Sequence, residues 1–567
     1  MSTPGTPSGT PSVTPAVTSP DVTPDVTVTV IVYNDAERLP RAVASVRRQT
    51  HRNIEIVISD DHSTDETPLA ARRLATQDPR IRHLRLPRNS GGCGAPRNRA
   101  LESARAPYLM FLDSDDELTD NAVELLLAAH REREIDFAMG AVQHVREDTG
   151  NRSTWMPHLV AERRTLDGIE ADPRLFFEHL ATSKMYARAF LDRHDLRFPE
   201  DIHYEDQLFT ARAYCLAKSF TIVPEPVYRW YTAPYAASDA ASISNSRHKL
   251  TNARDRVHVQ GLIDAFLAES GHESLREDKD YKFLKHDFRM YAGDLPHRDE
   301  EWLAAFAEIV TPYLETLAPG AYARLPRAER VILQLVRDRR LSEARLAARG
   351  VAHGAAPREV TTDTEGRVYW GGRVPDSDWS RRELDLSDLA LDTCPFPRAR
   401  FRHEITEVTR GPGASVDLTI RTFDPAMRLP VGPQRASLLL SPGRRRLTVP
   451  FCLSPVRPGL FEGHVHLDLA AAPLPLHGFQ GTRHPVLRIH HQGLTHTALL
   501  LAPLTFPPFT TRVDHHRLTI EPEPRGPGRL QIQWQPMGMT ALIRPLVRRA
   551  ARPRVRRAVR LVSSVLR

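Results

Sequence analysis

The sequence has little cysteine and no long apolar run. Its 567 residues include only four cysteines, which lie far apart and form no Cys-x-x-Cys pair: Cys93, Cys215, Cys394 and Cys452. This spacing excludes a zinc ribbon and a disulfide framework, and it predicts reduced thiols. No stretch of about 18 apolar residues occurs, and the N-terminus lacks the charged and apolar regions of a signal peptide. We therefore expect a cytoplasmic protein without a membrane-spanning helix.

The chain has no excess of positive charge outside its C-terminal tail. The chain has 77 basic and 70 acidic residues, a net charge of +7, and residues 541–567 alone hold nine arginines and no acid. A protein that binds nucleic acid through a whole domain would spread its positive charge and interleave it with aromatic side chains. Nucleic acid is therefore not an expected partner.

The basic tail has its own pattern. Four apolar residues lie near one helical face, with arginines around them: Val555, Val559, Val562 and Leu566. This arrangement favours binding to an anionic bilayer, as in a peripheral protein on the inner face of the cell membrane. A disordered arm that binds polyanions is the alternative, because two prolines interrupt the helix.

Composition divides the chain into five parts. Residues 1–25 are nearly all Ser, Thr, Pro, Gly and Val, so we expect a disordered leader. Strands and helices alternate in residues 26–245, which predicts an α/β domain with a doubly wound, mostly parallel sheet. Residues 246–355 have a helical pattern. Residues 356–538 are short strand-like runs parted by proline- and glycine-rich turns, which favours one or two β-sandwich modules, and residues 539–567 form the basic amphipathic tail.

An acidic cluster follows one predicted strand of the α/β domain. The apolar run 108–112 leads directly into Asp113, Asp115, Asp116 and Glu117. Such a cluster repels itself unless a cation sits in it, and Mg²⁺ or Mn²⁺ prefers carboxylate oxygen. The alternative is a polar loop that caps the next helix, which explains the acids singly but not their density. The sequence therefore predicts a divalent metal site at this strand end.

Polar motifs also follow the other predicted strands. In a doubly wound sheet, ligands bind at the carboxyl ends of the strands, so these motifs belong to one pocket. Tyr33 ends the first strand, and Asp60 and Asp61 end the second. Carboxylates there suit a base edge or a ribose hydroxyl better than a bare phosphate, and capping of the next helix is the alternative role. The third loop, residues 88–98, contains glycines, and its Arg97 is a candidate partner for a diphosphate or the nucleoside.

Two acids open a later helix, at Glu205 and Asp206. The helix dipole keeps carboxylates ionised at this position, and an ionised acid in a cleft can act as a general base toward an acceptor hydroxyl. By itself such a pair is more often a capping feature. Further along, Arg229 is a candidate partner for phosphate.

The order of these motifs resembles glycosyltransferase family 2 over roughly residues 26–245. The motifs that carry the resemblance are Val30-Ile31-Val32-Tyr33-Asn34, Gln49-Thr50, Asp60-Asp61-x-Ser63-Thr64-Asp65, Asn89-x-Gly91, Arg97-Asn98, Leu112-Asp113-Ser114-Asp115-Asp116 and Glu205-Asp206. The resemblance implies a GT-A fold and an inverting transfer of a hexosyl or N-acetylhexosaminyl group from a nucleotide sugar. That donor is usually UDP-linked in the family, and the transfer uses a divalent metal, Mn²⁺ or Mg²⁺.

The resemblance also implies roles for single residues, by matching position. Asp61, with Asp60, would hold the nucleobase, Asp113 the ribose and Asp115 the metal. Asp206 would be the catalytic base, with Glu205 beside it. The other expected nucleotide-sugar contacts are Tyr33, Arg97, Ser114 and Arg229.

The sequence departs from the family pattern at two places. The first strand end, Val30-Ile31-Val32-Tyr33-Asn34, has no proline, and His62 stands where glycine is usual. Neither departure touches the expected chemistry directly, but His62 is expected to alter its loop.

The succession of a transferase domain, helices and β modules is similar to the layout of enzymes that decorate wall teichoic acid and related phosphate-rich polymers. The expected partners are a nucleotide-sugar donor and a glycan or phosphate-rich polymer of the cell envelope, with β modules that hold the polymer or form a homo-oligomer. Two other functions fit the chain: a carbohydrate- or polymer-binding protein with an inactive transferase domain, and a nucleotidyltransferase. The sequence alone does not choose the sugar, the acceptor or the linkage.

Overall fold

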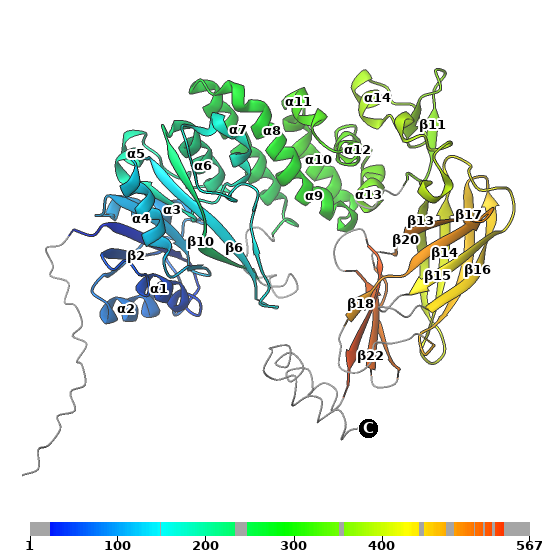
Figure 1. The fold of residues 1–567 in the computed structure, drawn as a ribbon, viewed down its shortest axis with the longest axis horizontal. Coiled ribbons are helices and arrows are strands. Elements are labelled where there is room, and N and C mark those ends of the chain that lie inside the picture. The colour runs from blue at the N-terminus through cyan, green and yellow to red at the C-terminus, as the bar shows by residue number, and fades with distance from the viewer. Residues whose placement is uncertain are drawn as a thin grey trace, which may run out of the picture. The chain divides into compact units, whose positions relative to one another are not determined.

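The structure is a computed structural model (Figure 1), which describes residues 23–147, 149–232, 246–350, 356–440, 447–471, 481–503, 505–513, 516–523 and 528–537. The chain divides into two compact units, Met1–Ser246 with Asp255–Lys279 and Arg247–Arg254 with Asp280–Arg567. The predicted basic tail and nearly all of the predicted leader lie outside the described residues. Within the described ranges, no helix combines the length and the apolar character needed to cross a bilayer.

The first unit is built on a ten-stranded mixed sheet whose main path runs β3-β2-β1-β4-β9-β6-β10-β5. Its first half is parallel, because β1 pairs with β2 and β4, and β2 pairs with β3. All residues of β1 and β2 are buried, as expected for strands covered on both faces. The elements of this half are β1 (Val26–Val32), α1 (Leu39–Arg47), β2 (Ile54–Asp60), α2 (Thr67–Gln77), β3 (Ile81–Arg85), α3 (Gly94–Ser103) and β4 (Tyr108–Asp113).

The second half of the sheet contains a strand that the sequence pattern did not predict. Strand β9 (Lys184–Ala187) lies antiparallel between β4 and β6. It is short, and its buried Lys184 pairs with Glu178, so it has no apolar run to recognise. The other elements are β5 (Glu117–Leu118), α4 (Ala122–Glu132), β6 (Phe137–Arg146), β7 (Arg152–Thr154), β8 (Arg164–Leu166), η1 (Ile169–Ala171), η2 (Pro173–Phe177), α5 (Arg188–Arg193), α6 (Glu205–Leu216) and β10 (Phe220–Thr232).

An aromatic cluster fixes the loop that precedes α6. Phe198 stacks on Phe209 of α6 with ring centroids 3.8 Å apart. Phe111 of β4 meets both rings edge-on, at 5.2 and 6.1 Å. All three are buried, and Phe111 stands two residues before the acidic cluster. Core packing therefore holds the start of α6 close to the end of β4.

The segment from residue 250 to residue 350 is mostly helical, as the sequence predicts. Aspartate 299 caps one of these helices, because its Oδ1 accepts from the Trp302 amide at 2.7 Å. The elements are α7 (Leu250–Glu269), η5 (Glu273–Leu275), α8 (Arg276–Lys282), the π-helical turn η6 (Phe283–Phe288), α9 (Arg289–Asp294), η7 (Leu295–His297), α10 (Glu300–Leu314), α11 (Pro319–Ala323), α12 (Arg327–Arg337) and α13 (Leu341–Gly350).

The remainder of the second unit is mostly antiparallel strands. A seven-stranded sheet has the order β13-β14-β17-β16-β15-β19-β20, and a four-stranded sheet has the order β18-β23-β22-β21. Both contribute to one apolar core, in which Leu487 and Ile405 of the larger sheet join Ile520 and Trp534 of the smaller one. The predicted succession of an α/β sheet, helices and β-rich modules is confirmed. The elements are β11 (Val360–Thr362), β12 (Val368–Trp370), α14 (Asp378–Leu384), η9 (Ser387–Leu389), η10 (Phe396–Arg398), β13 (Arg402–Arg410), β14 (Ser415–Phe423), β15 (Gln434–Leu440), β16 (Leu447–Arg457), β17 (Leu460–Asp468), β18 (Gly481–Arg483), β19 (Val486–His491), β20 (Leu494–Leu499), β21 (Phe509–Val513), β22 (His516–Pro522) and β23 (Leu530–Pro536).

Candidate active site

The acidic cluster at the end of β4 separates into two exposed and two buried acids. The side chains of Asp113 and Asp115 are 34% and 42% exposed. Asp116 is buried and accepts hydrogen bonds from the Tyr228 hydroxyl at 2.7 Å and the Tyr231 amide at 2.8 Å. Glu117 is also buried and paired to arginines. Asp116 and Glu117 therefore hold the loop, while the side chains of Asp113 and Asp115 stay partly exposed.

Negative charge outweighs positive charge around Asp115. Loss of surrounding water and the nearby negative charge of Asp113 raise the pKa of the Asp115 carboxyl to about 6. In the part of the chain that the structure describes, its carboxylate pairs with Arg38, whose Nη1 is 3.4 Å from Oδ2. A divalent cation fits this excess of negative charge, and the donors are the carboxylate oxygens that Mg²⁺ and Mn²⁺ prefer. Among the residues that the structure describes, no three His, Cys, Asp or Glu side chains converge as a metal cage, so substrate and water oxygens would complete the coordination.

Arg38 is a site residue that the sequence analysis missed. It precedes α1, at the carboxyl end of β1, and its Nε donates to Asp35 Oδ1 at 2.8 Å. Asp35 in turn accepts from the Ser114 hydroxyl at 2.6 Å, so Ser114 is held between β1 and the acidic loop. A half-exposed guanidinium beside Asp115 is suited to an anionic group. The sequence signal that could have found it is a basic residue three positions after Asp35.

Arg97 joins the acidic loop to the start of α6. The guanidinium is buried, with Nη2 2.9 Å from Asp113 Oδ1 and Nη1 2.5 Å from Glu205 Oε1. Burial would lower the pKa of the Arg97 guanidinium, but the two acids raise it above its ordinary value. The sequence analysis assigned Arg97 to a diphosphate or the nucleoside. In the structure both of its terminal nitrogens hold protein carboxylates, so Arg97 positions the site.

The glycine-bearing loop before α3 serves protein packing. A Cβ on Gly94 would lie 2.1 Å from the Pro199 carbonyl oxygen, so only glycine allows this approach. Asn98 of α3 adds three hydrogen bonds of 2.9 Å, to the backbone N–H and carbonyl of Phe198 and to the Glu200 carboxylate. Helix α3 is thus fastened to the loop that leads into α6.

The start of α6 presents Asp206. Tyr204, the residue before the helix, has a left-handed backbone with φ of 67°, and the Arg256 guanidinium covers its ring at 3.7 Å. Glu205 is buried against Arg97, and burial raises the pKa of its carboxyl while Arg97 opposes that shift. Asp206 is half-buried in the first turn, where the helix dipole favours an anion. Of the two predicted catalytic acids, Asp206 is the more exposed one, and its catalytic role stays a prediction.

Replacing Arg97 by Met should destabilise the first unit by about 3–5 kcal/mol at pH 8, because Glu205 would stay buried without its partner. Burial raises the pKa of Glu205 in the folded state, so the folded state binds the proton more readily and the loss should shrink toward pH 5. Calorimetry at both pH values measures this effect. Arg99→Met, on the exposed face of the same helix, is the matched control, and equal unfolding of the two variants would contradict the assignment.

The two acids at the end of β2 differ in surroundings. Asp60 is fully buried. Burial would raise the pKa of its carboxyl, but the His83 ring 3.5 Å away and hydrogen bonding from Ser63 lower it. Its Oδ1 accepts from the Ser63 amide at 2.8 Å. Asp61 accepts from the Asn89 amide group at 2.9 Å and from the Ser90 hydroxyl at 2.9 Å. Asp60 therefore shapes its loop, and Asp61 ties the second loop to the third beside the predicted nucleoside site.

Tyr33 and His62 line the same edge. Tyr33 follows β1 with 48% of its surface exposed, as a ring that stacks on a ligand requires. His62 has φ of 60°, which explains why glycine suits this position. Its Nδ1 lies 3.0 Å from the Leu86 carbonyl oxygen. The loop thus keeps its shape without glycine.

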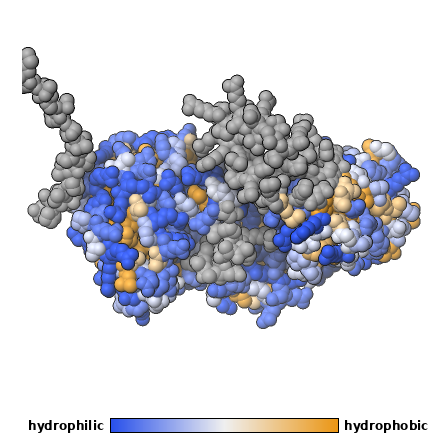
Figure 2. Space-filling model, turned by 90° about the horizontal axis from the view of Figure 1, so that it is seen from below, coloured by the Kyte–Doolittle hydropathy of each residue, from blue (hydrophilic) through white to orange (hydrophobic). Residues whose placement is uncertain are grey.

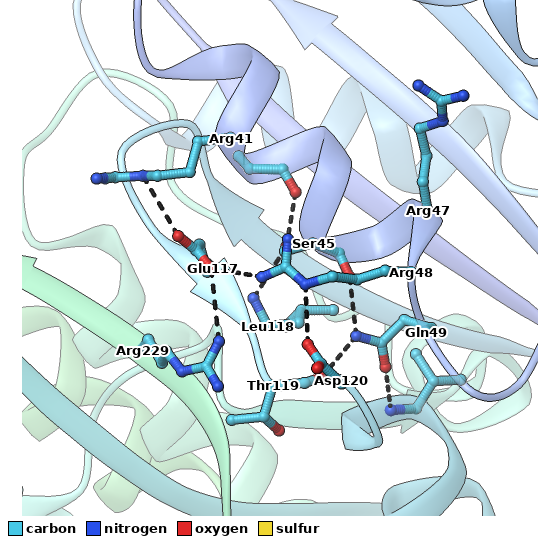
Figure 3. Close-up of polar contacts among 12 residues, drawn as sticks. Arg41, Ser45, Arg47, Arg48, Gln49, Glu117, Leu118, Thr119, Asp120 and Arg229 are labelled. Atoms are coloured by element: carbon cyan, nitrogen blue, oxygen red, sulfur yellow. Dashed lines mark hydrogen bonds and ion pairs between the residues drawn. The ribbon is translucent and has the colours of Figure 1, made fainter.

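Arg229 points at Glu117 (Figure 3). Its Nη1 lies 3.5 Å from Glu117 Oε2, and Arg41 and Arg48 reach the same carboxylate at 3.6 and 2.5 Å. Arg41 also donates to the backbone oxygen of Asp115. These arginines brace the acidic loop, and the phosphate role of Arg229 stays a prediction.

In the parallel half of the sheet, carboxylates follow the strand ends and lie near a helix that opens with an acid. This arrangement is typical of α/β domains that bind a ligand at the carboxyl ends of their strands. Residues 27–194 match the family model described as Glycosyl transferase family 2. This part of the chain is a family 2 glycosyltransferase domain, and the resemblance read from the motifs is confirmed.

Individual glycosyltransferases are also similar to this chain. EpsH of Bacillus subtilis is 33% identical over 209 residues, which cover 35% of this chain and 59% of EpsH. The poly(ribitol-phosphate) beta-N-acetylglucosaminyltransferase TarP of Staphylococcus aureus is 28% identical over 226 residues, or 39% of this chain and 67% of TarP. The crystal structure of S. aureus TarS 1–349 with UDP-GlcNAc superposes with a TM-score of 0.51 at 20% identity, over 62% of this chain and 98% of that one, and shows a shared fold.

Proposed function

We propose that the chain is an inverting, metal-dependent glycosyltransferase that moves a sugar from a UDP-sugar to a hydroxyl of a cell-envelope polymer. The observation that carries this proposal is the Arg97 guanidinium, which holds Asp113 and Glu205 at once. It brings the predicted donor site and the predicted base, about ninety residues apart in sequence, into one place.

The donor would lie along the strand ends. Tyr33 offers an aromatic face to the base, and Asp61 stands on the nucleoside side, in a loop shaped by Asp60. Asp113 faces the ribose. Ser114, bonded to Asp35, keeps the acidic loop against β1, and Arg38 opposes the diphosphate.

Asp115 would hold the divalent cation, with Asp113 beside it. When bound, the cation supplies Lewis-acid neutralisation of the leaving diphosphate. Asp206 removes the proton from the acceptor hydroxyl as its oxygen attacks the anomeric carbon. The new carbon–oxygen bond forms while the bond to the diphosphate oxygen breaks, and the bonding electrons leave with the nucleoside diphosphate. One such displacement inverts the anomeric centre.

The acceptor assignment comes from the relatives. TarP carries the name of a poly(ribitol-phosphate) beta-N-acetylglucosaminyltransferase. We propose that the acceptor of this chain is also a polyol-phosphate polymer.

The β-rich part would bind polymer or form a homo-oligomer. Figure 2 shows apolar residues in orange on the surface of the β-rich part. The exposed apolar side chains of this part are Met427 and Val431 in the loop between β14 and β15, Val456 of β16 and Leu494 of β20.

A donor screen tests the proposal. The full chain is incubated with Mn²⁺, a panel of nucleotide sugars and poly(ribitol phosphate), and the released nucleotide is identified. Release of UDP together with added hexose mass on the polymer is expected. Release of pyrophosphate would indicate a nucleotidyltransferase, and polymer binding without any release would indicate a binding protein with an inactive domain.

A further inference from the structure

A cavity of about 560 Å³ lies where the two edge strands of the seven-stranded sheet meet. Strand β13 is one edge and β20 the other. Leu501, just after β20, donates to the His403 carbonyl at 3.0 Å, and its own carbonyl accepts from Ile405 at 2.6 Å, so the sheet curls toward closure (Figure 1). A volume of this size suits a small organic ligand.

The cavity has apolar walls, two histidines and a basic rim. Phe401, Val486, Leu499 and Leu501 supply the walls. His403 and His496 line the inside and are 2% and 6% exposed. Arg398 and Arg400 also line the cavity but are exposed. The cavity therefore offers polar groups inside and positive charge at its mouth.

The histidines have unused hydrogen-bonding capacity. Their ring centroids are 5.4 Å apart, and His403 Nδ1 is 2.9 Å from the Thr422 hydroxyl. Within the described ranges, His403 Nε2 and the two nitrogens of His496 make no hydrogen bond of ordinary length and angle. Burial lowers the pKa of both rings, to about 4 for His496, where the Pro397 backbone opposes the shift. Both imidazoles are neutral at pH 7.

Neutral imidazoles select the chemistry of the occupant. Each ring has one N–H donor and one acceptor nitrogen, which matches a hydroxyl, since a hydroxyl also donates and accepts. A charged group would lose its hydration inside but would be stabilised beside the exposed arginines. A metal ion is disfavoured, because among the described residues no third His, Cys, Asp or Glu joins the pair.

The geometry points to a binding site for a phosphorylated polyol or sugar unit, with hydroxyls on His403 and His496 and the phosphate at Arg398 and Arg400. This deepens the proposed function and rests on it for the source of the ligand, a polyol-phosphate acceptor. The β-rich part would then hold acceptor polymer through a site of its own. The binding itself does not depend on catalysis.

Ribitol 5-phosphate is the probe, titrated into the full chain and followed by ligand-observed NMR. Binding is expected for the wild type, and His496→Leu should weaken it at least tenfold. The same variant should keep or raise the Tm, because it removes a buried imidazole without partners. His466→Leu, on the exposed face of β17, should bind as the wild type does. Equal binding by His496→Leu, or no binding by the wild type, would overturn the site.

A second variant keeps the test independent of folding. Arg398→Gln, at the exposed rim, should weaken ribitol 5-phosphate severalfold and leave unphosphorylated ribitol unchanged. Equal weakening of both ligands would contradict the phosphate position.

Nucleotide release without polymer separates this proposal from the proposed function. His496→Leu should release UDP at the wild-type rate. If the wild type binds the probe but releases no nucleotide, the pocket stands and the transferase proposal fails. If nucleotide is released but the probe does not bind, the pocket proposal fails alone.

Discussion

Asp206→Asn should bind the donor normally and transfer sugar about 10² to 10⁴ times more slowly. The amide has nearly the shape of the carboxylate but cannot take the acceptor proton. Asp206 stands in the first turn of α6, and its neighbour Glu205 is already engaged by Arg97. Glu205 is therefore not expected to take over the role of Asp206 as base. Calorimetric titration with UDP-sugar and a transfer assay, run on the same preparation, measure both effects.

The matched control is Asp201→Asn, an exposed aspartate in the loop before α6. It should leave binding and transfer unchanged. Turnover by Asp206→Asn at the wild-type rate would refute the base assignment, and lost donor binding would show instead that Asp206 belongs to the donor site.

Asp115→Asn should remove most Mn²⁺-dependent donor binding and slow transfer by roughly 10³-fold, since bound-metal stabilisation is worth several kcal/mol. The exposed Asp120 of the same loop is paired to Arg48, so Asp120→Asn should change little. Mn²⁺ titration of UDP binding compares the two variants. Equal Mn²⁺ dependence of the wild type and Asp115→Asn would contradict the metal assignment.

The wild type should also show a pH dependence from Asp115. Its pKa of about 6 means that a proton competes with the cation below pH 6. Mn²⁺ affinity should therefore be level above about pH 7 and fall roughly tenfold for each unit well below pH 6. Asp115→Asn should abolish this slope.

The rule that ligands bind at the carboxyl ends of parallel strands predicted the position of the candidate site. Asp113, Asp115 and Tyr33 follow strands that the apolar runs mark clearly, and parallel strands bring their carboxyl ends together. Asp206 was predicted because it opens a helix and fits the family order. These residues could be predicted as site residues because the local sequence shows that they stand at a strand end or at a helix start.

Tertiary pairing was beyond the sequence. Arg97 and Glu205 are 108 residues apart, and nothing local says that their charges meet in the interior. For the same reason the sequence predicted a ligand contact for Arg97 and did not predict its pairing with Glu205. Strand β9 was missed because Lys184 interrupts its pattern, and its burial depends on Glu178.

The measurement that tests the central claim most directly is ¹H NMR of the product formed from UDP-GlcNAc, Mn²⁺ and poly(ribitol phosphate). The account predicts a β-anomeric signal on the polymer that grows in step with UDP release. An α-anomeric signal, or UDP release without any sugar on an acceptor, would contradict it.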